Sequence, residues 1–200
     1  MSVFLRACDL QGKPPLHITV ADYNPSVLYL ASLPNFLLAW ALQQRDNNIL
    51  LQQALDTEGE LELSLEVKES FAAFLLASHI SLSFVSGGWS PEFVDLLYHP
   101  AVVSDAFADS NLLIVGAETI YSPFALGLFA ETLLSILHRE QREKPKNQAI
   151  AVIAAKRLYF GVGGSLDDFV DKMKASGVLV EGVREETEGV RRGVVQCLLG

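Results

Sequence analysis

The sequence has little cysteine and a shortage of positive charge. Two of its 200 residues are cysteines, Cys8 and Cys197, which are far apart and form no CxxC pair. We interpret both as small buried apolar side chains in a reducing compartment. Lysine and arginine number 15 against 24 acidic residues, a formal net charge of -9. Because a nucleic-acid footprint needs a basic stripe, we expect no direct nucleic-acid binding, and we interpret the short basic runs at 139–146 and 191–192 as solvated surface.

The usual signatures of metal sites and serine hydrolases are also missing. The four histidines are scattered without the spacing of metal ligands: His17, His79, His99 and His138. No GxSxG motif and no plausible Ser-His-Asp set is present. We therefore predict no metal site and no serine-hydrolase chemistry.

Long uninterrupted apolar runs are missing as well. The apolar N-terminal stretch is short and is interrupted by Asp9 and Lys13, so we expect no secretory signal. The longest apolar candidate, residues 27–42, is broken by Ser, Pro and Asn, so we expect no membrane-spanning helix. These observations predict a soluble protein of the cytoplasm or nucleus without membrane contact. The sequence does not determine its oligomeric state.

Apolar residues are abundant, at 50% hydrophobic and 20% charged, which is typical of a globular protein. We predict one domain over residues 1–200. Expected strands alternate with helical patterns, which indicates an α/β fold with a mostly parallel, doubly wound sheet. The strands are expected at 16–21, 80–85, 112–116, 149–155, 178–183 and 190–199. Since no helix separates the last two, one of them should run antiparallel.

The expected helices begin at short cap-and-proline signals. Helical patterns cover residues 2–10, 25–44, 61–78, the stretch after Pro91, 123–139 and 165–177. Pro34 lies inside the second of these, so we expect a kink or restart there, with Ser32 as a possible cap. Residues 45–60 are polar and are expected to form a loop.

One stretch organises the rest of the chain, residues 112–123, LLIVGAETIYSP. A short apolar run bounded by turn signals is typical of a strand buried on both faces. The following Ser122 and Pro123 indicate the start of a helix. Glu118 and Tyr121 are therefore expected at the carboxyl end of a parallel strand, where ligands bind in open α/β sheets.

Residues 22–25 and 87–91 follow the same sequence pattern: the end of a strand, a polar or aromatic residue, a capping residue and a proline. An acid such as Asp22 at a strand end can accept hydrogen bonds from two ribose hydroxyls, or it can cap the following helix. The spacing of the residues favours neither interpretation over the other. Trp89 follows two glycines and could stack on a flat ring, but a half-buried core tryptophan is the simpler interpretation.

Each remaining candidate also has a structural alternative. Glu118 could cap the helix that begins near Pro123, and Tyr121 could simply pack. The glycine-rich residues 161–164 lack the Lys-Ser/Thr of a phosphate loop, so a tight turn is the default interpretation.

Several of these motifs together resemble the histidine protein methyltransferases, and most of all their fungal branch. They are AETIYSP at 117–123, AKRLYFGVGG at 155–164, DYN at 22–24, LPN at 33–35 and SGGW at 86–89. These proteins are seven-strand, S-adenosylmethionine-dependent enzymes with relatives among the protein-lysine methyltransferases. The resemblance implies a Rossmann-like class I methyltransferase sheet, and as substrate a histidine of a large-subunit ribosomal protein.

The resemblance also implies roles for individual residues. Glu118 and Tyr121 would be catalytic, with Glu118 accepting a hydrogen bond from the substrate imidazole and Tyr121 positioning the ring or the methyl group. The cofactor-binding residues would be Asp22, Tyr23, Asn24, Gly87, Trp89 and Ala117. The substrate-binding residues would be Thr119, Tyr159, Phe160 and Gly161.

One part of the family pattern has no match in this sequence. The family's first strand, in the middle of the sheet, ends in a glycine-bearing turn that holds the methionine part of the cofactor. Without this central strand its two neighbours would have unpaired backbone groups, so we expect either an N-terminally truncated form or a rearranged sheet. Besides histidine methylation, two alternatives stay open: a catalytically inactive, methyltransferase-like fragment that acts through protein contacts, and a protein-lysine methyltransferase.

Overall fold

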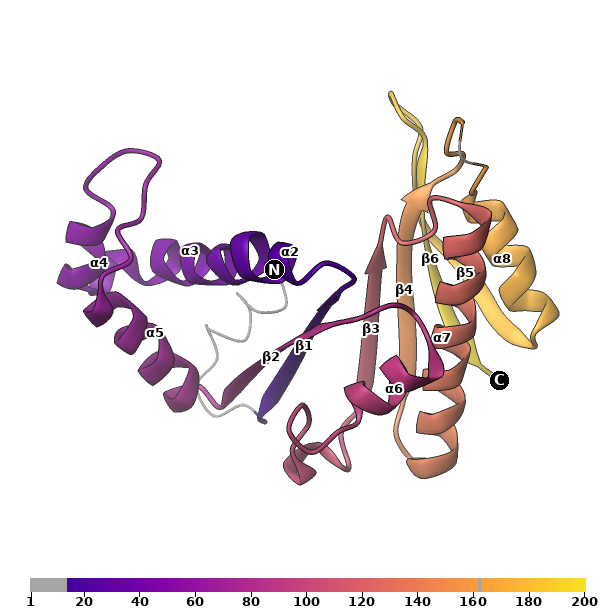
Figure 1. The fold of residues 1–200 in the computed structure, drawn as a ribbon, viewed down its shortest axis with the longest axis horizontal. Helices are drawn as coiled ribbons and strands as arrows, with labels where there is room; N and C mark the ends of the chain where they lie inside the picture. The colour runs from indigo at the N-terminus through magenta and orange to yellow at the C-terminus, as the bar shows by residue number, and fades with distance from the viewer. Residues whose placement is uncertain (1–13, 162) are drawn as a thin grey trace. The chain divides into compact units, whose positions relative to one another are not determined.

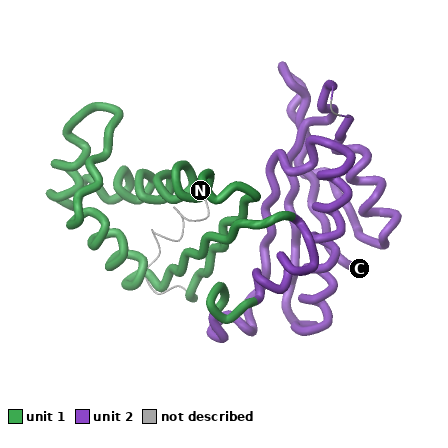
Figure 2. Tube along the Cα trace, in the orientation of Figure 1, with its two compact units in different colours: residues 1–88, 99–103 green, residues 89–98, 104–200 purple. Residues whose placement is uncertain are grey.

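The structure is a computed structural model that describes residues 14–161 and 163–200. Strands alternate with helices, so the α/β class is confirmed (Figure 1). The chain divides into two compact units (Figure 2): unit 1 comprises residues 1–88 and 99–103, and unit 2 comprises residues 89–98 and 104–200. Each unit is described by itself. The helix expected over residues 2–10, Cys8 and Val162 lie outside the described residues.

Unit 1 contains a two-stranded parallel sheet. Strand β1 (Leu16–Asp22) pairs with β2 (Ile80–Ser86) in a register that runs from Leu16 opposite Ile80 to Asp22 opposite Ser86. The helical elements are α2 (Pro25–Val27), a π-helical turn η1 (Leu28–Ser32), α3 (Leu33–Gln44), η2 (Arg45–Asn47), α4 (Ile49–Ala54) and α5 (Leu65–Ala77). Trp40, which is 1% exposed, centres the core of this unit and packs against Phe71 at a ring-centroid distance of 5.1 Å.

The caps of unit 1 confirm some predictions and correct others. Asn24 caps α2 through a bond from the Ser26 backbone N–H, as expected. The helix does change at Pro34, but Ser32 is not a cap, because its backbone is already helical and its side chain makes no capping bond. The loop expected over 45–60 is also wrong in part. Asn48 accepts hydrogen bonds from two backbone N–H groups, and this cap starts α4.

The apolar stretch after β1 is a longer helix than expected. Residues Pro25–Asn47 form 23 helical residues that are long and apolar enough, by length and composition only, to cross a membrane. The expectation that Ser, Pro and Asn break this stretch is therefore wrong, because the helix continues through the π-helical turn, which contains Ser32, into α3, which contains Pro34 and Asn35. Its side chains Trp40 and Ala41 lie in the core of unit 1.

Unit 2 contains a mixed sheet with the strand order β3-β4-β6-β5. Its strands are β3 (Leu112–Ala117), β4 (Ala149–Lys156), β5 (Val178–Glu186) and β6 (Arg192–Leu199). Its helices are α6 (Pro91–Leu97), the 3-10 turn η3 (Asp105–Phe107), α7 (Pro123–Glu143) and α8 (Leu166–Ala175). β3 and β4 are parallel, whereas β6 runs antiparallel to both β4 and β5. The predicted antiparallel end of the chain is confirmed.

Helices α7 and α8 cover one face of this sheet. Phe129 of α7 and Phe169 of α8 lie with ring centroids 6.1 Å apart and join a core that contains Ile153 of β4. Gly116 of β3 lets α7 approach closely, because a Cβ there would lie 2.8 Å from Ile153 and 2.9 Å from Phe129. Cys197 is free and fully buried, as expected of an apolar side chain.

Within the described chain β3 is an edge strand that pairs only with β4, and β1 and β2 pair only with each other. The expectation that residues 112–116 are buried on both faces is wrong for two of them. Leu113 is 51% exposed and Val115 is 67% exposed, whereas Ile114 and Gly116 face α7 and the core. Alternation along the strand puts the first two on the opposite face, which the described helices of unit 2 do not cover.

Candidate functional site

Glu118 follows β3 directly and has an unusual backbone conformation. Its φ of 58° lies in the left-handed region, which non-glycine residues adopt at a cost. Its backbone N–H donates to the Ala154 carbonyl of β4 at 3.0 Å, which extends the strand pairing to this residue. Strained residues of this kind cluster at functional sites. This conformation supports the position predicted for Glu118.

Both carboxylate oxygens of Glu118 have partners. Tyr159 donates its phenol proton to Oε2 at 2.6 Å, and the Arg192 guanidinium Nε donates to Oε1 at 3.4 Å. The Glu118 side chain is 45% exposed and that of Arg192 is 51% exposed. One oxygen is therefore held closely and the other loosely, with half of the side chain accessible.

The strand order explains why these three residues meet. β4 lies between β3 and β6, and Lys156 at its end pairs with Arg192 at the start of β6. The loop after β4 returns Tyr159 to this edge, where its phenol oxygen accepts a 3.3 Å hydrogen bond from the Lys156 backbone N–H. Arg192 is exposed, as expected of solvated surface, and in addition its guanidinium reaches Glu118. Only the antiparallel register of the last strand brings it to Glu118.

Burial, and after it the hydrogen bond to Glu118, raises the pKa of Tyr159 to about 12. The residue is 7% exposed. A phenol with this pKa keeps its proton at neutral pH and stays a hydrogen-bond donor. Tyr159 therefore contacts Glu118, whereas its predicted contact with substrate stays a prediction.

The structural alternative for Glu118 is excluded by the helix that follows. Ser122 caps α7 by accepting a 3.2 Å hydrogen bond from the Ala125 backbone N–H, so Glu118 is not the cap. Tyr121 is 54% exposed and does not pack in the core, unlike its neighbour Ile120. The Thr119 hydroxyl is buried and has no hydrogen-bond partner within the described chain. It is the kind of orphaned polar atom that a ligand can satisfy.

The loop after β4 is a tight turn, as expected by default. Gly161 and Gly163 have positive φ, and the Gly163 N–H donates to the Tyr159 carbonyl. Gly164 lies so close to the backbone of Ile120 that no side chain would fit there. Phe160 is 90% exposed, next to the buried Tyr159. The loop therefore fixes Tyr159 inward and leaves Phe160 accessible.

Trp89 is partly buried against the core of unit 2. Its ring meets Phe93 at 5.2 Å and Phe129 at 5.4 Å, both edge to face. This contact supports the simpler interpretation of a half-buried core tryptophan, while its predicted contact with adenine stays a prediction.

The residues predicted around the ribose lie in unit 1. The Asp22 carboxylate accepts a 2.8 Å hydrogen bond from the Asn24 backbone N–H and so shapes the turn, while Asn24 does the capping. The Gly87 N–H donates to the Asp22 carbonyl at 3.3 Å. Tyr23 is 77% exposed. Asp22 is thus not the helix cap, and its role toward a cofactor stays a prediction.

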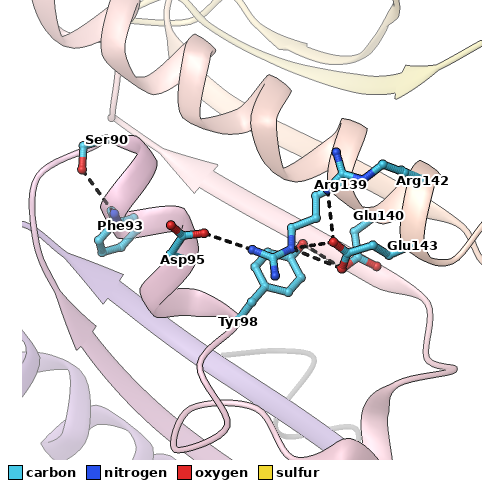
Figure 3. A network of polar contacts seen from close by, with 8 residues as sticks. All are labelled: Ser90, Phe93, Asp95, Tyr98, Arg139, Glu140, Arg142 and Glu143. Carbon is cyan, nitrogen blue, oxygen red and sulfur yellow. Dashed lines mark hydrogen bonds and ion pairs between the residues drawn. The ribbon is translucent and has the colours of Figure 1, made fainter.

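A second polar cluster lies between α6 and α7 and has a structural role (Figure 3). Glu140 is 4% exposed; its carboxylate accepts a hydrogen bond from the Tyr98 phenol at 2.7 Å and forms an ion pair with Lys144 at 3.2 Å. Arg139 lies over the Tyr98 ring, 4.0 Å from its centroid, and pairs with Asp95 of α6. These contacts join the end of α6 to α7.

Comparison with known proteins adds an independent line. No protein-family model matches the chain. It is 30% identical over 193 residues to histidine protein methyltransferase 1 of Saccharomyces cerevisiae, covering 90% of this chain and 48% of that protein. It is equally identical over 186 residues to the Schizosaccharomyces pombe protein of the same name, with 90% and 48% covered. A Rattus norvegicus homologue is 30% identical over 176 residues, with 88% and 41% covered.

The resemblance that the motifs predicted is thus confirmed over most of the chain. The chain spans about half the length of the curated relatives that it matches.

Proposed function

We propose that this chain, a relative of the histidine protein methyltransferases, carries the methyl-acceptor side of an S-adenosylmethionine-dependent enzyme that methylates a histidine of a protein. The observation that carries the proposal is Glu118, a strained, half-exposed carboxylate held by Tyr159 at the carboxyl end of β3. As substrate we propose a large-subunit ribosomal protein, and as location the cytoplasm or nucleus. The names of the relatives favour histidine over lysine as the target.

The chemistry asks the protein mainly for alignment. S-adenosylmethionine would supply a methyl group on a sulfonium, so that a nitrogen–carbon bond forms as the carbon–sulfur bond breaks. A neutral imidazole, with an unperturbed pKa of ~6.5, is already a competent nucleophile. Glu118 would accept a hydrogen bond from the imidazole's other N–H group, which fixes the tautomer and stabilises the positive charge that develops.

Neighbouring residues would complete the acceptor side. The exposed Tyr121 would position the ring or the methyl group. Thr119, whose buried hydroxyl has no partner within the described chain, would donate to or accept from substrate or cofactor. Phe160 and Gly161, in the exposed loop, would contact the protein substrate.

The cofactor assignments rest on the resemblance. We propose that Asp22 accepts the ribose hydroxyls through its carboxylate, with Tyr23, Asn24 and Gly87 beside it. Asp22 Oδ1 is engaged by the Asn24 N–H, which leaves acceptor capacity on the carboxylate. For Trp89 and Ala117 we propose contacts with the adenine and the cofactor, respectively.

We also propose that β3 is a neighbour of the family's first strand, which the described strands do not include. Its pairing with β4 alone within the described chain supports this idea, as do the exposed Leu113 and Val115 on β3. The same two observations favour a second candidate function, a methyltransferase-like fragment that binds no cofactor and acts through protein contacts.

Isothermal titration of the chain with S-adenosylmethionine separates the two. Micromolar affinity supports the enzyme, whereas no detectable heat from protein with a cooperative unfolding transition supports the fragment. A matched Glu118→Gln variant should bind cofactor with unchanged affinity, because Glu118 is assigned to the methyl acceptor.

A further inference from the structure

We propose that Tyr159 is a positioning residue that fixes one carboxylate oxygen of Glu118, and that Arg192 holds the other oxygen until the substrate's N–H group replaces it. The inference rests on the proposed function and deepens it. It assigns Tyr159 to Glu118 instead of to the substrate, and it gives Arg192 a role that the motifs do not.

Tyr159 is built to stay in place. It is 7% exposed, its phenol oxygen accepts from the Lys156 backbone N–H, and its own backbone N–H donates to Gly164 at 3.0 Å. Its 2.6 Å bond to Glu118 Oε2 has the length of a charge-assisted hydrogen bond. These contacts fix the position of Tyr159 in the fold, and Tyr159 in turn fixes the orientation of Glu118 Oε2.

Arg192 is held only weakly at Glu118. Its 3.4 Å contact with Oε1 is long, and both side chains are about half exposed. An exposed ion pair of this kind contributes at most ~1 kcal/mol, which is about a fivefold change in an equilibrium constant. Glu186 lies directly opposite Arg192 in the β5–β6 register, although its carboxylate already pairs with Arg184 at 3.2 Å. Leaving Glu118 therefore costs Arg192 little.

The chemistry favours this exchange. Methylation makes the substrate ring positive, and a guanidinium on the same carboxylate oxygen would repel that charge. If the substrate N–H takes the place of Arg192 on Oε1, Glu118 meets the developing charge while Tyr159 still holds Oε2. The two neighbours should therefore affect different kinetic constants.

The first test is turnover with tritiated S-adenosylmethionine and purified large ribosomal subunits as the probe. Tyr159→Phe should lower kcat about ten- to a hundredfold, the effect of one hydrogen bond to a charged group. In a Glu118→Gln background the same change should have little further effect, since Tyr159 acts through Glu118. Multiplicative losses in the double variant would overturn the assignment, because they indicate a merely structural role.

Arg192→Gln should lower the apparent KM up to about fivefold and leave kcat within about twofold, because a competitor is removed. The matched control is Arg191→Gln, since Arg191 pairs with Glu185 and not with Glu118. A tenfold loss of kcat in Arg192→Gln alone would overturn the exchange, because the guanidinium would then act in the transition state.

A second test needs no turnover. The carboxyl 13C resonance of Glu118, assigned by its loss in Glu118→Gln, should shift strongly in Tyr159→Phe and weakly in Arg192→Gln. An unshifted resonance in Tyr159→Phe would overturn the positioning role. If the two variants show these shifts but the wild-type chain transfers no methyl group, the proposed function fails, while the assignment of Tyr159 and Arg192 to the Glu118 carboxylate stands.

Discussion

The phenol of Tyr98 donates a 2.7 Å hydrogen bond to the carboxylate of Glu140, which is 4% exposed (Figure 3). Removing the Tyr98 hydroxyl leaves one oxygen of the buried Glu140 carboxylate without that donor, while Lys144 still pairs with the other oxygen. Tyr98→Phe should therefore lower the free energy of unfolding by about 1–3 kcal/mol, measured by urea titration. The control is Arg142→Ala, an exposed residue, which should stay within ~0.5 kcal/mol. Equal midpoints of urea unfolding for the two variants would contradict a stabilising role of the Tyr98–Glu140 hydrogen bond.

Stability should fall at high pH. Burial raises the pKa of Tyr159 to about 12, whereas an unfolded tyrosine titrates near ~10. The unfolded chain therefore loses its proton first, so this contribution is complete below pH ~10 and is lost as the pH rises toward 12. Unfolding followed between pH 9 and 11.5 should show this decline.

Comparison with Tyr159→Phe isolates that residue, because other groups titrate nearby. Burial also raises the pKa of Cys197, to about 11. In Tyr159→Phe the decline above pH ~10 should be shallower, and absorbance at 295 nm should show one late-titrating tyrosine fewer. An identical slope in both proteins would count against the raised pKa.

Two glycines should respond in opposite directions to alanine. Gly116→Ala places a Cβ 2.8 Å from Ile153 and 2.9 Å from Phe129, so overpacking should destabilise by about 1–3 kcal/mol. Gly127 lies inside α7 with no atom within 4 Å of its ideal Cβ, so Gly127→Ala should stabilise by about 0.5–1 kcal/mol. Thermal unfolding of both variants measures the difference. A stabilised Gly116→Ala would refute the close contact of α7 with β3.

Glu118→Gln should reduce turnover at least about tenfold, because the amide keeps the shape but loses the charge that stabilises an imidazolium. Its affinity for S-adenosylmethionine should stay within about twofold. Glu188→Gln, in the exposed hairpin, is the matched control and should be silent in both measurements. Wild-type turnover by Glu118→Gln would remove Glu118 from the mechanism.

Local signals in the sequence predicted the helices and strands better than they predicted how these pack and pair. Ser122 and Asn24 cap helices at the positions that the pattern of a capping residue and a proline predicted, because capping depends on neighbours within a few residues. Ser32 failed as a cap because the preceding helix continues as a π-turn into α3. Asn48 was missed as a cap because the polar residues around it resemble a loop.

The candidate site shows the same division. Glu118 could be found from its place after an apolar strand, and Tyr159 from a motif of the family. Arg192 could not, because its contact with Glu118 depends on the register of β6 against β4 over a separation of 74 residues. Exposure of Leu113 and Val115 could not be predicted either, since an apolar strand looks the same in the middle of a sheet and at its edge.

Among the described strands β3 pairs with β4 alone, and this has a consequence for the chain in solution. Its edge presents a row of backbone donors and acceptors, and residues 112–117 contain no charge and no proline to discourage another strand. Natural edge strands are normally protected by such residues. Concentrated samples should therefore self-associate through β3, and a lysine introduced at Val115 should keep the protein monomeric.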